Sequence, residues 1–107
     1  MADTHPNLTV LDNPLAQQHM TVLRDRNTDP DVFRRTTRQL STALLHEAAR
    51  SFETEEVQVD TPLERTTGVR IAKDLVAVPV LRAGLGLLEG ITRQLPNLKV
   101  GYVGVFR

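Results

Sequence analysis

The sequence contains no cysteine. This excludes disulfide bonds, thiolate zinc sites and a cysteine nucleophile, and it agrees with a cytoplasmic location. Charge of one sign is not in excess either, because thirteen basic residues balance thirteen acidic ones. A balanced chain has no general attraction for nucleic acid or for an anionic membrane. We therefore expect neither as a partner.

Long hydrophobic runs and targeting segments are lacking as well. The longest purely apolar run is Leu75–Leu81, whereas a membrane-spanning helix needs roughly 20 apolar residues. The start, Met1–Pro6, has neither the basic nor the apolar part of a secretory signal. The three histidines, His5, His19 and His46, are far apart in the sequence. We expect a soluble, cytoplasmic protein without a metal site of its own.

Two helices are predicted within residues 1–53. Each begins with a capping residue followed by proline, Asn13-Pro14 and Asp29-Pro30, and proline is favoured at the first helical position. The spacing of apolar residues extends the first helix over residues 14–24 and the second over 30–52. One stripe of the second helix is expected to pack inward. It consists of Phe33, Thr37, Leu40, Leu44 and Ala48.

The rest of the chain has the pattern of strands. Residues 54–72 favour a hairpin arm with strands Thr54–Asp60 and Thr67–Ile71. Residues 73–107 favour a parallel βαβ unit: strand Leu75–Leu81, helix Ala83–Leu95 and strand Leu98–Phe106. The first of these strands is apolar without alternation, which is typical of a strand buried on both faces of a parallel sheet. Since Pro79 cannot donate to a sheet ladder, we expect the strand to end there or to lie at an edge.

The candidate site lies where these strands end. Arg82 follows the first strand of the βαβ unit and Arg107 follows the second. If the strands are neighbours, both guanidinium groups lie at the same edge, where open parallel sheets bind ligands. Gly84 and Gly86 would let the backbone approach a ligand, and the following helix would offer N–H groups to an anion. This pattern favours a phosphate or pyrophosphate site.

Other interpretations of these residues stay open. A glycine-rich turn between strand and helix also occurs for packing alone, and a lone arginine there is often only solvated. The glycines read G-x-G-x-x-x-G, one residue longer than the dinucleotide fingerprint, and no acidic residue ends the second strand. Solvated positions are also expected for three glutamates and a run of arginines along the second helix, with cation binding by the glutamates and an interface role for the arginines as the less favoured alternatives. These are Glu53, Glu55, Glu56, Arg34, Arg35 and Arg38.

One segment carries a specific resemblance. The stretch Val78–Gly90, reading VPVLRAGLGLLEG, closely resembles the pyrophosphate loop of uracil phosphoribosyltransferases. The segments Asn13–Asp25, Phe33–Ala48, Val59–Leu63 and Lys99–Arg107 resemble that family's helices, hairpin arm and next core strand, in the same order. The resemblance covers nearly the whole of this chain, which is about half as long as members of that family usually are.

The resemblance implies an α/β fold, namely part of the type I phosphoribosyltransferase fold, with N-terminal helices, a hairpin arm and one βαβ unit. It implies transfer of phosphoribose from phosphoribosyl pyrophosphate to uracil, with Mg²⁺ carried on the pyrophosphate, in a homo-oligomer. Arg82 and Arg107, with loop residues Ala83 and Gly84, would bind phosphoribosyl pyrophosphate. In related enzymes this loop carries a non-proline cis peptide. We expect the matching bond, Leu81–Arg82, to be trans or disordered in this chain.

The resemblance also has gaps. The family's ribose-phosphate loop and its uracil-binding segment have no counterpart here, and Thr66-Thr67-Gly68 follows polar residues rather than a buried strand. We therefore expect no catalytic residue in this chain and no activity from it alone. Three hypotheses remain: the amino-terminal half of a uracil phosphoribosyltransferase, a non-catalytic remnant that acts in association, and a nucleotide-cofactor domain.

Overall fold

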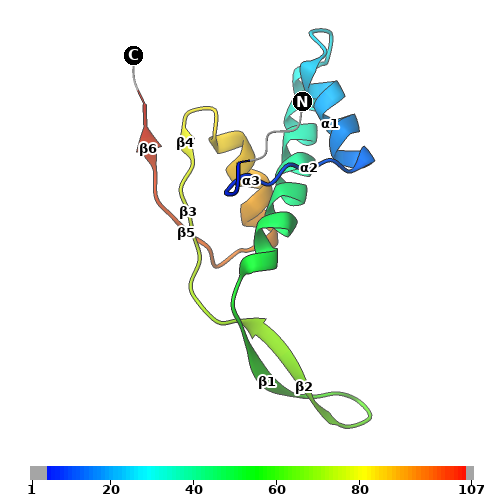
Figure 1. The fold of residues 1–107 in the computed structure, drawn as a ribbon, viewed down its shortest axis with the longest axis vertical. Coiled ribbons are helices and arrows are strands. Elements are labelled where there is room, and N and C mark those ends of the chain that lie inside the picture. Colours follow the sequence, from blue (N-terminus) through cyan, green and yellow to red (C-terminus); the bar gives the residue numbers. More distant parts are fainter. Residues whose placement is uncertain (1–4, 106–107) are drawn as a thin grey trace.

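The computed structural model describes residues 5–105, and Figure 1 shows three successive parts: helices, a hairpin and a parallel strand pair with its crossover helix. The elements in chain order are α1 (Pro14–Arg24), α2 (Pro30–Ala48), the short 3-10 turn η1 (Ala49–Ser51), β1 (Thr54–Asp60), β2 (Arg65–Ile71), β3 (Val76–Ala77), β4 (Val80–Leu81), α3 (Leu85–Gln94), β5 (Lys99–Val100) and β6 (Val103–Gly104).

Both predicted helix starts are confirmed. The Asn13 side chain accepts a hydrogen bond from the Ala16 amide at 2.8 Å, and Pro14 opens α1. Asp29 precedes Pro30 at the start of α2, but its side chain makes no capping hydrogen bond. The two helices pack against each other. The second helix ends at Ala48, and the predicted extension toward residue 52 is the turn η1.

The hairpin forms as predicted and stands apart from the helices (Figure 1). Strands β1 and β2 pair antiparallel from Thr54 opposite Ile71 to Asp60 opposite Arg65. The second strand begins at Arg65, two residues before the predicted start. Most hairpin side chains are exposed, and Leu63 at the tip is 96% exposed.

The βαβ unit is also present, with parallel pairing of β3 with β5 and of β4 with β6. The predicted long strands are each broken into two short ones. The register stays constant across the break, since the amide of Gly101 still donates to Ala77 and that of Val103 to Pro79. Pro79 has no N–H and cannot donate in return, which accounts for the interruption. Phe106, assigned to the second strand from the sequence, lies outside the described residues.

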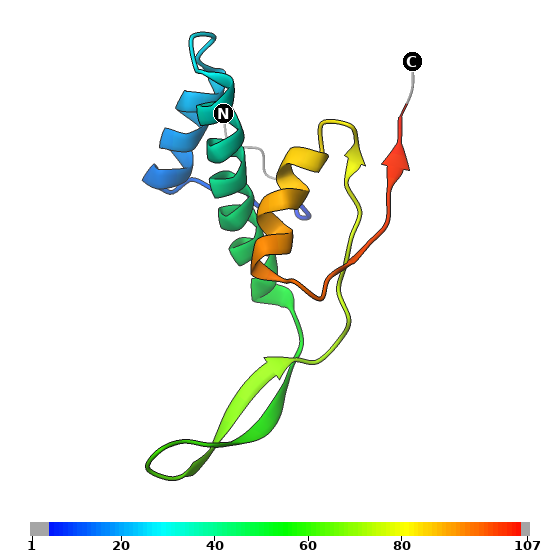
Figure 2. The ribbon, with the colours of Figure 1, turned by 180° about the vertical axis from the view of Figure 1, so that it is seen from behind.

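Helix α3 lies between the parallel strands and α2, as the two opposite views show (Figures 1 and 2). Only one face of the strand pair is covered. On the other face Val76, Val78 and Val80 are 60%, 53% and 52% exposed. The apolar pattern is typical of a strand buried on both faces, but no described element of this chain packs on the second face.

The described residues contain little buried apolar surface. Ala16 is the only hydrophobic residue among them that is buried, and the buried positions of α2 are Thr36 and Ser41. Two members of the expected apolar stripe, Phe33 and Leu44, are 46% and 43% exposed. The radius of gyration is 17.3 Å, compared with about 13 Å for a compact domain of this length. No helix within residues 5–105 is long and apolar enough to cross a membrane.

Candidate phosphate-binding loop

The candidate loop consists of Arg82, Ala83 and Gly84, which connect the end of β4 to the start of α3. Because β4 and β6 are parallel, their carboxyl ends reach the same edge, and Arg82 lies at that edge. Its side chain is exposed and forms no ion pair or hydrogen bond with any residue of 5–105. The second candidate, Arg107, lies outside the described residues. Whether the two arginines meet thus stays a prediction.

The backbone of the loop is tightly held. The Gly84 amide donates to the Val80 carbonyl at 2.8 Å, and the Leu85 amide donates to the Arg82 carbonyl at 3.1 Å. A Cβ atom added to Gly84 would lie 2.6 Å from the Val80 carbonyl oxygen. Glycine is therefore required at position 84 for this turn to close. The Leu81–Arg82 peptide is cis, so the expectation of a trans or disordered bond in this chain is wrong.

The free N–H groups of the loop differ from those expected. The helix-start amides of Gly84, Leu85 and Gly86 all donate to carbonyls of the preceding turn. The amides of Arg82 and Ala83 have no hydrogen-bond acceptor among residues 5–105. A backbone N–H group left unpaired is a strong donor. These two amides, beside the exposed guanidinium of Arg82, are the donors that the loop offers to an anion.

The other two glycines of the motif, Gly86 and Gly90, face helix α2. A Cβ atom at Gly90 would lie 1.9 Å from the Ser41 hydroxyl oxygen and 2.6 Å from the Arg38 carbonyl oxygen of α2. A Cβ atom at Gly86 would also meet α2, at 3.4 Å from a methyl group of Thr37. That Gly86 lets the backbone approach a ligand stays a prediction. The motif combines one turn glycine with two glycines at a helix crossing.

Several of the glutamates and arginines considered as weaker candidates form ion pairs within the described residues. Glu53 pairs with Lys73 at 3.0 Å, and Glu55 pairs with Arg70 at 2.5 Å. No group of three or more metal-ligating side chains gathers within residues 5–105. The arginine run divides: Arg34 pairs with Asp31 on its own helix, whereas Arg38 reaches Glu89 of α3 at 3.1 Å. The expectation that the whole run faces solvent is therefore wrong at Arg38.

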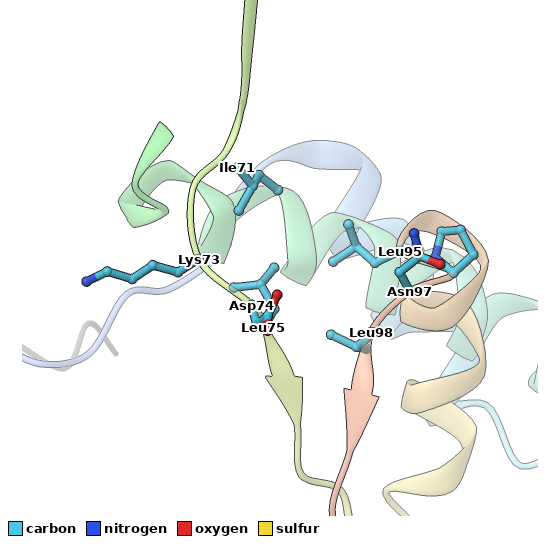
Figure 3. A pocket seen from close by; sticks show the side chains of 8 residues that line it. Ile71, Lys73, Asp74, Leu75, Leu95, Asn97 and Leu98 are labelled. Carbon is cyan, nitrogen blue, oxygen red and sulfur yellow. The ribbon is translucent and has the colours of Figure 1, made fainter. Parts of the chain in front are cut away.

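A separate hollow of about 280 Å³ lies at the opposite ends of the strands (Figure 3). Apolar side chains of Ile71, Leu75, Leu95 and Leu98 form much of its wall, and Lys73 points away from it. Lys73 is instead paired with Glu53. This hollow precedes β3 and β5, while Arg82 follows β4. It therefore contributes nothing to the candidate loop.

The family model and the curated relatives of this chain carry the same family name. The sequence pattern of the family described as uracil phosphoribosyltransferase matches residues 10–107. A protein of that name from Renibacterium salmoninarum is 48% identical over 99 residues, which are 92% of this chain and 47% of the relative. One from Salinibacter ruber is 43% identical over 101 residues, 94% of this chain and 48% of the relative. The chain spans about half the length of the curated relatives that it matches.

A solved protein structure from Aquifex aeolicus is similar in fold, with a TM-score of 0.82 and 33% identity, over 92% of this chain and 48% of that one. Helices followed by a hairpin and a parallel βαβ unit, with an arginine–glycine turn at the strand end, form part of an α/β fold of the phosphoribosyltransferase type. The chain belongs to the uracil phosphoribosyltransferase family. This finding favours the first of the three hypotheses over a nucleotide-cofactor domain.

Proposed function

We propose that this chain supplies the pyrophosphate-binding part of an enzyme that transfers phosphoribose from phosphoribosyl pyrophosphate to uracil, giving UMP and pyrophosphate in pyrimidine salvage. The observation that carries the proposal is the loop at the end of β4. There the exposed Arg82 guanidinium lies beside two amides, those of Arg82 and Ala83, without acceptors among residues 5–105. Membership of the uracil phosphoribosyltransferase family supports the choice of substrates.

In this proposal Arg82 and the Ala83 amide hold the pyrophosphate group and stabilise the charge that grows on it as the bond to ribose breaks. Donors fixed before the reaction stabilise such a developing charge without further reorganisation. Arg107 would add a second guanidinium at the same edge. The loop fits the anion rather than a metal ion, since Val80–Gly86 contains no carboxylate or imidazole. Mg²⁺ bound to the pyrophosphate would supply further positive charge.

The contacts to the ribose 5-phosphate and to uracil are proposed to come from the part of the relatives that this chain does not cover. Orientation of two substrates contributes much of the rate of such a transfer. We therefore expect the 107-residue chain to be inactive alone. We further propose that the whole enzyme is a cytoplasmic homo-oligomer in which the hairpin β1–β2 contacts another copy, because that hairpin is exposed along both strands.

The test combines this chain with a polypeptide covering the remaining half of a curated relative. Uracil-dependent release of pyrophosphate is expected from the mixture and not from either piece. Arg82→Ala should lower kcat by about 10²–10³-fold, the effect of removing one donor to a developing oxyanion. Its circular dichroism spectrum should not change. Arg50→Ala removes an exposed arginine that pairs only with Glu47 among the described residues, and it is the matched control.

Two outcomes would contradict the proposal. Activity of the mixture that is unaffected by Arg82→Ala would remove this loop from the site. A correctly folded mixture without activity would favour the non-catalytic remnant that acts only in association.

A further inference from the structure

Helix α3 connects two parts of the molecule, since it follows directly on the loop at Arg82 and its middle crosses α2 (Figure 2). Hydrogen bonds join the loop backbone to the start of the helix. The Leu85 amide donates to the Arg82 carbonyl at 3.1 Å, and the Gly86 amide donates to the Ala83 carbonyl at 3.3 Å. A rotation of α3 therefore moves the loop with it.

The crossing with α2 is centred on a close contact with main-chain atoms. A Cβ atom added to Gly90 would lie 2.6 Å from the Arg38 carbonyl oxygen. The hydroxyl groups of Ser41 and Thr42 donate to this same carbonyl, at 2.7 Å and 3.2 Å, and Ser41 is buried. The contact fixes how closely the two helices approach. Rotation of α3 about its own axis is resisted by contacts to either side of it.

The side chain of Arg38 makes such a contact. Its Nη1 atom donates to Oε1 of Glu89, the residue before Gly90, at 3.1 Å. Arg93, one turn further along α3, reaches the same oxygen at 3.6 Å. Arg38 thus touches α3 twice, through its main chain and through its guanidinium group. No other ion pair within residues 5–105 joins two α-helices.

The surroundings of this ion pair distinguish it from a fully exposed one. Exposed ion pairs contribute little to stability, because water and salt screen them. The Arg38 side chain, however, is only 28% exposed, and the Glu89 carboxylate is shared by two guanidinium groups. Neither Arg38 nor Arg93 has another ion-pair partner within residues 5–105. Loss of the carboxylate would leave two like charges at the crossing.

We propose that Glu89 and Arg38 are positioning residues for the loop at Arg82. Glycine at position 90 permits the close approach of α3, and the ion pair then fixes the rotation of this helix and with it the direction of the Arg82 guanidinium and the Ala83 amide. Neither Glu89 nor Arg38 touches the pyrophosphate. The kinetic consequence of this inference rests on the proposed transfer function, whereas the position of the loop is measurable without activity.

The first measurement is a distance within the 107-residue chain. Because the sequence has no cysteine, spin labels attach only to the introduced His46→Cys on α2 and Ala83→Cys in the loop, both at exposed positions. Labelled chains are diluted with unlabelled protein, and pulsed electron paramagnetic resonance gives the distance distribution. Glu89→Gln should widen this distribution, and the reversed pair Arg38→Glu/Glu89→Arg should restore it. Asp31→Asn, which removes the carboxylate of an ion pair within α2, should leave it unchanged.

The second measurement uses the mixture of this chain with the remaining half of a curated relative, and it separates positioning from folding. Glu89→Gln should lower kcat/KM for phosphoribosyl pyrophosphate by about tenfold or more, since a displacement of about 1 Å can cost about a hundredfold. KM for uracil should not change. In a chain that already carries Arg82→Ala, the same substitution should have little further effect, because residues that act through one another are not additive. Arg38→Lys, which keeps the charge, should retain more activity than Arg38→Gln.

The outcomes separate this inference from the proposed function. An unchanged distance distribution in Glu89→Gln, or an equal change in Asp31→Asn, would overturn the inference whether or not the mixture is active. A full additional loss of activity in the Arg82→Ala chain would overturn it too, because Glu89 would then act independently of the loop. An inactive mixture whose labelled chain shows the expected widening would contradict the transfer function and support the positioning of the loop by this ion pair.

Discussion

The open face of the strand pair leads to a quantitative prediction about association. The accessible surface of the chain is 9002 Å², whereas a compact monomer of 11.9 kDa exposes about 6,000 Å². The excess of about 3,000 Å² per chain is as large as the total area, about 2,000–5,000 Å² over both partners, that permanent protein complexes bury. We therefore expect the chain to self-associate when it is alone.

The perturbation is the triple variant Val76→Thr, Val78→Thr and Val80→Thr. Threonine keeps the shape and the strand preference of valine but adds a hydroxyl group. Each hydroxyl buried without a partner costs about 1–3 kcal/mol. Three of them should weaken association through this face by about 3 kcal/mol or more, which is roughly a hundredfold in the equilibrium constant.

Sedimentation velocity over a range of protein concentrations measures the effect. Val10→Thr is the matched control, because Val10 is 62% exposed but lies before α1, away from the strand pair and the hairpin. The triple variant should shift the chain toward smaller species, and the control should not.

Adding a polypeptide that covers the rest of a curated relative should compete with self-association and protect the amides of residues 98–105 from hydrogen exchange. A monodisperse, cooperatively melting wild-type monomer would refute the reasoning.

Two further predictions concern the helices, each measured by urea unfolding at a fixed protein concentration. Asn13→Ala removes the capping hydrogen bond of α1 and should cost about 1 kcal/mol; Asp29→Ala should cost less, because this side chain makes no such bond. Gly90→Ala places a methyl group 2.6 Å from the Arg38 carbonyl oxygen and should cost about 1–3 kcal/mol. Gly68→Ala, where the nearest atoms lie at 3.9 Å, is its control. Equal effects within either pair would contradict the structural explanation.

Local signals explain what the sequence predicted well. A capping residue before proline marks a helix start through contacts within a few residues, so the starts of α1 and α2 are confirmed. The hairpin likewise depends on adjacent segments. Arg82 was assigned to the strand end because the apolar run stops just before it, and the structure places it there.

Features that depend on distant segments were not predictable. The pattern of β3 and β4 resembles that of a strand buried on both faces, yet no described element of this chain covers Val76 and Val78. The glycine spacing gives no indication of what lies opposite Gly90, which is Ser41 of an earlier helix. The convergence of Arg38 and Arg93 on Glu89 was missed for the same reason. Its only local signal is the i,i+4 spacing of Glu89 and Arg93.

The glycines also determine how the loop at Arg82 is positioned. Gly84 brings one end of α3 against the backbone of Val80, and Gly90 brings its middle against the backbone of Arg38. Both contacts are with main-chain atoms, which cannot rotate away as a side chain can. Helix α3 is therefore held between β4 and α2 by close backbone approach, although Leu85 remains 42% exposed. The orientation of the Arg82 loop therefore depends mainly on glycine at positions 84 and 90. The identity of the apolar residue at position 85 matters less, because that side chain is largely exposed.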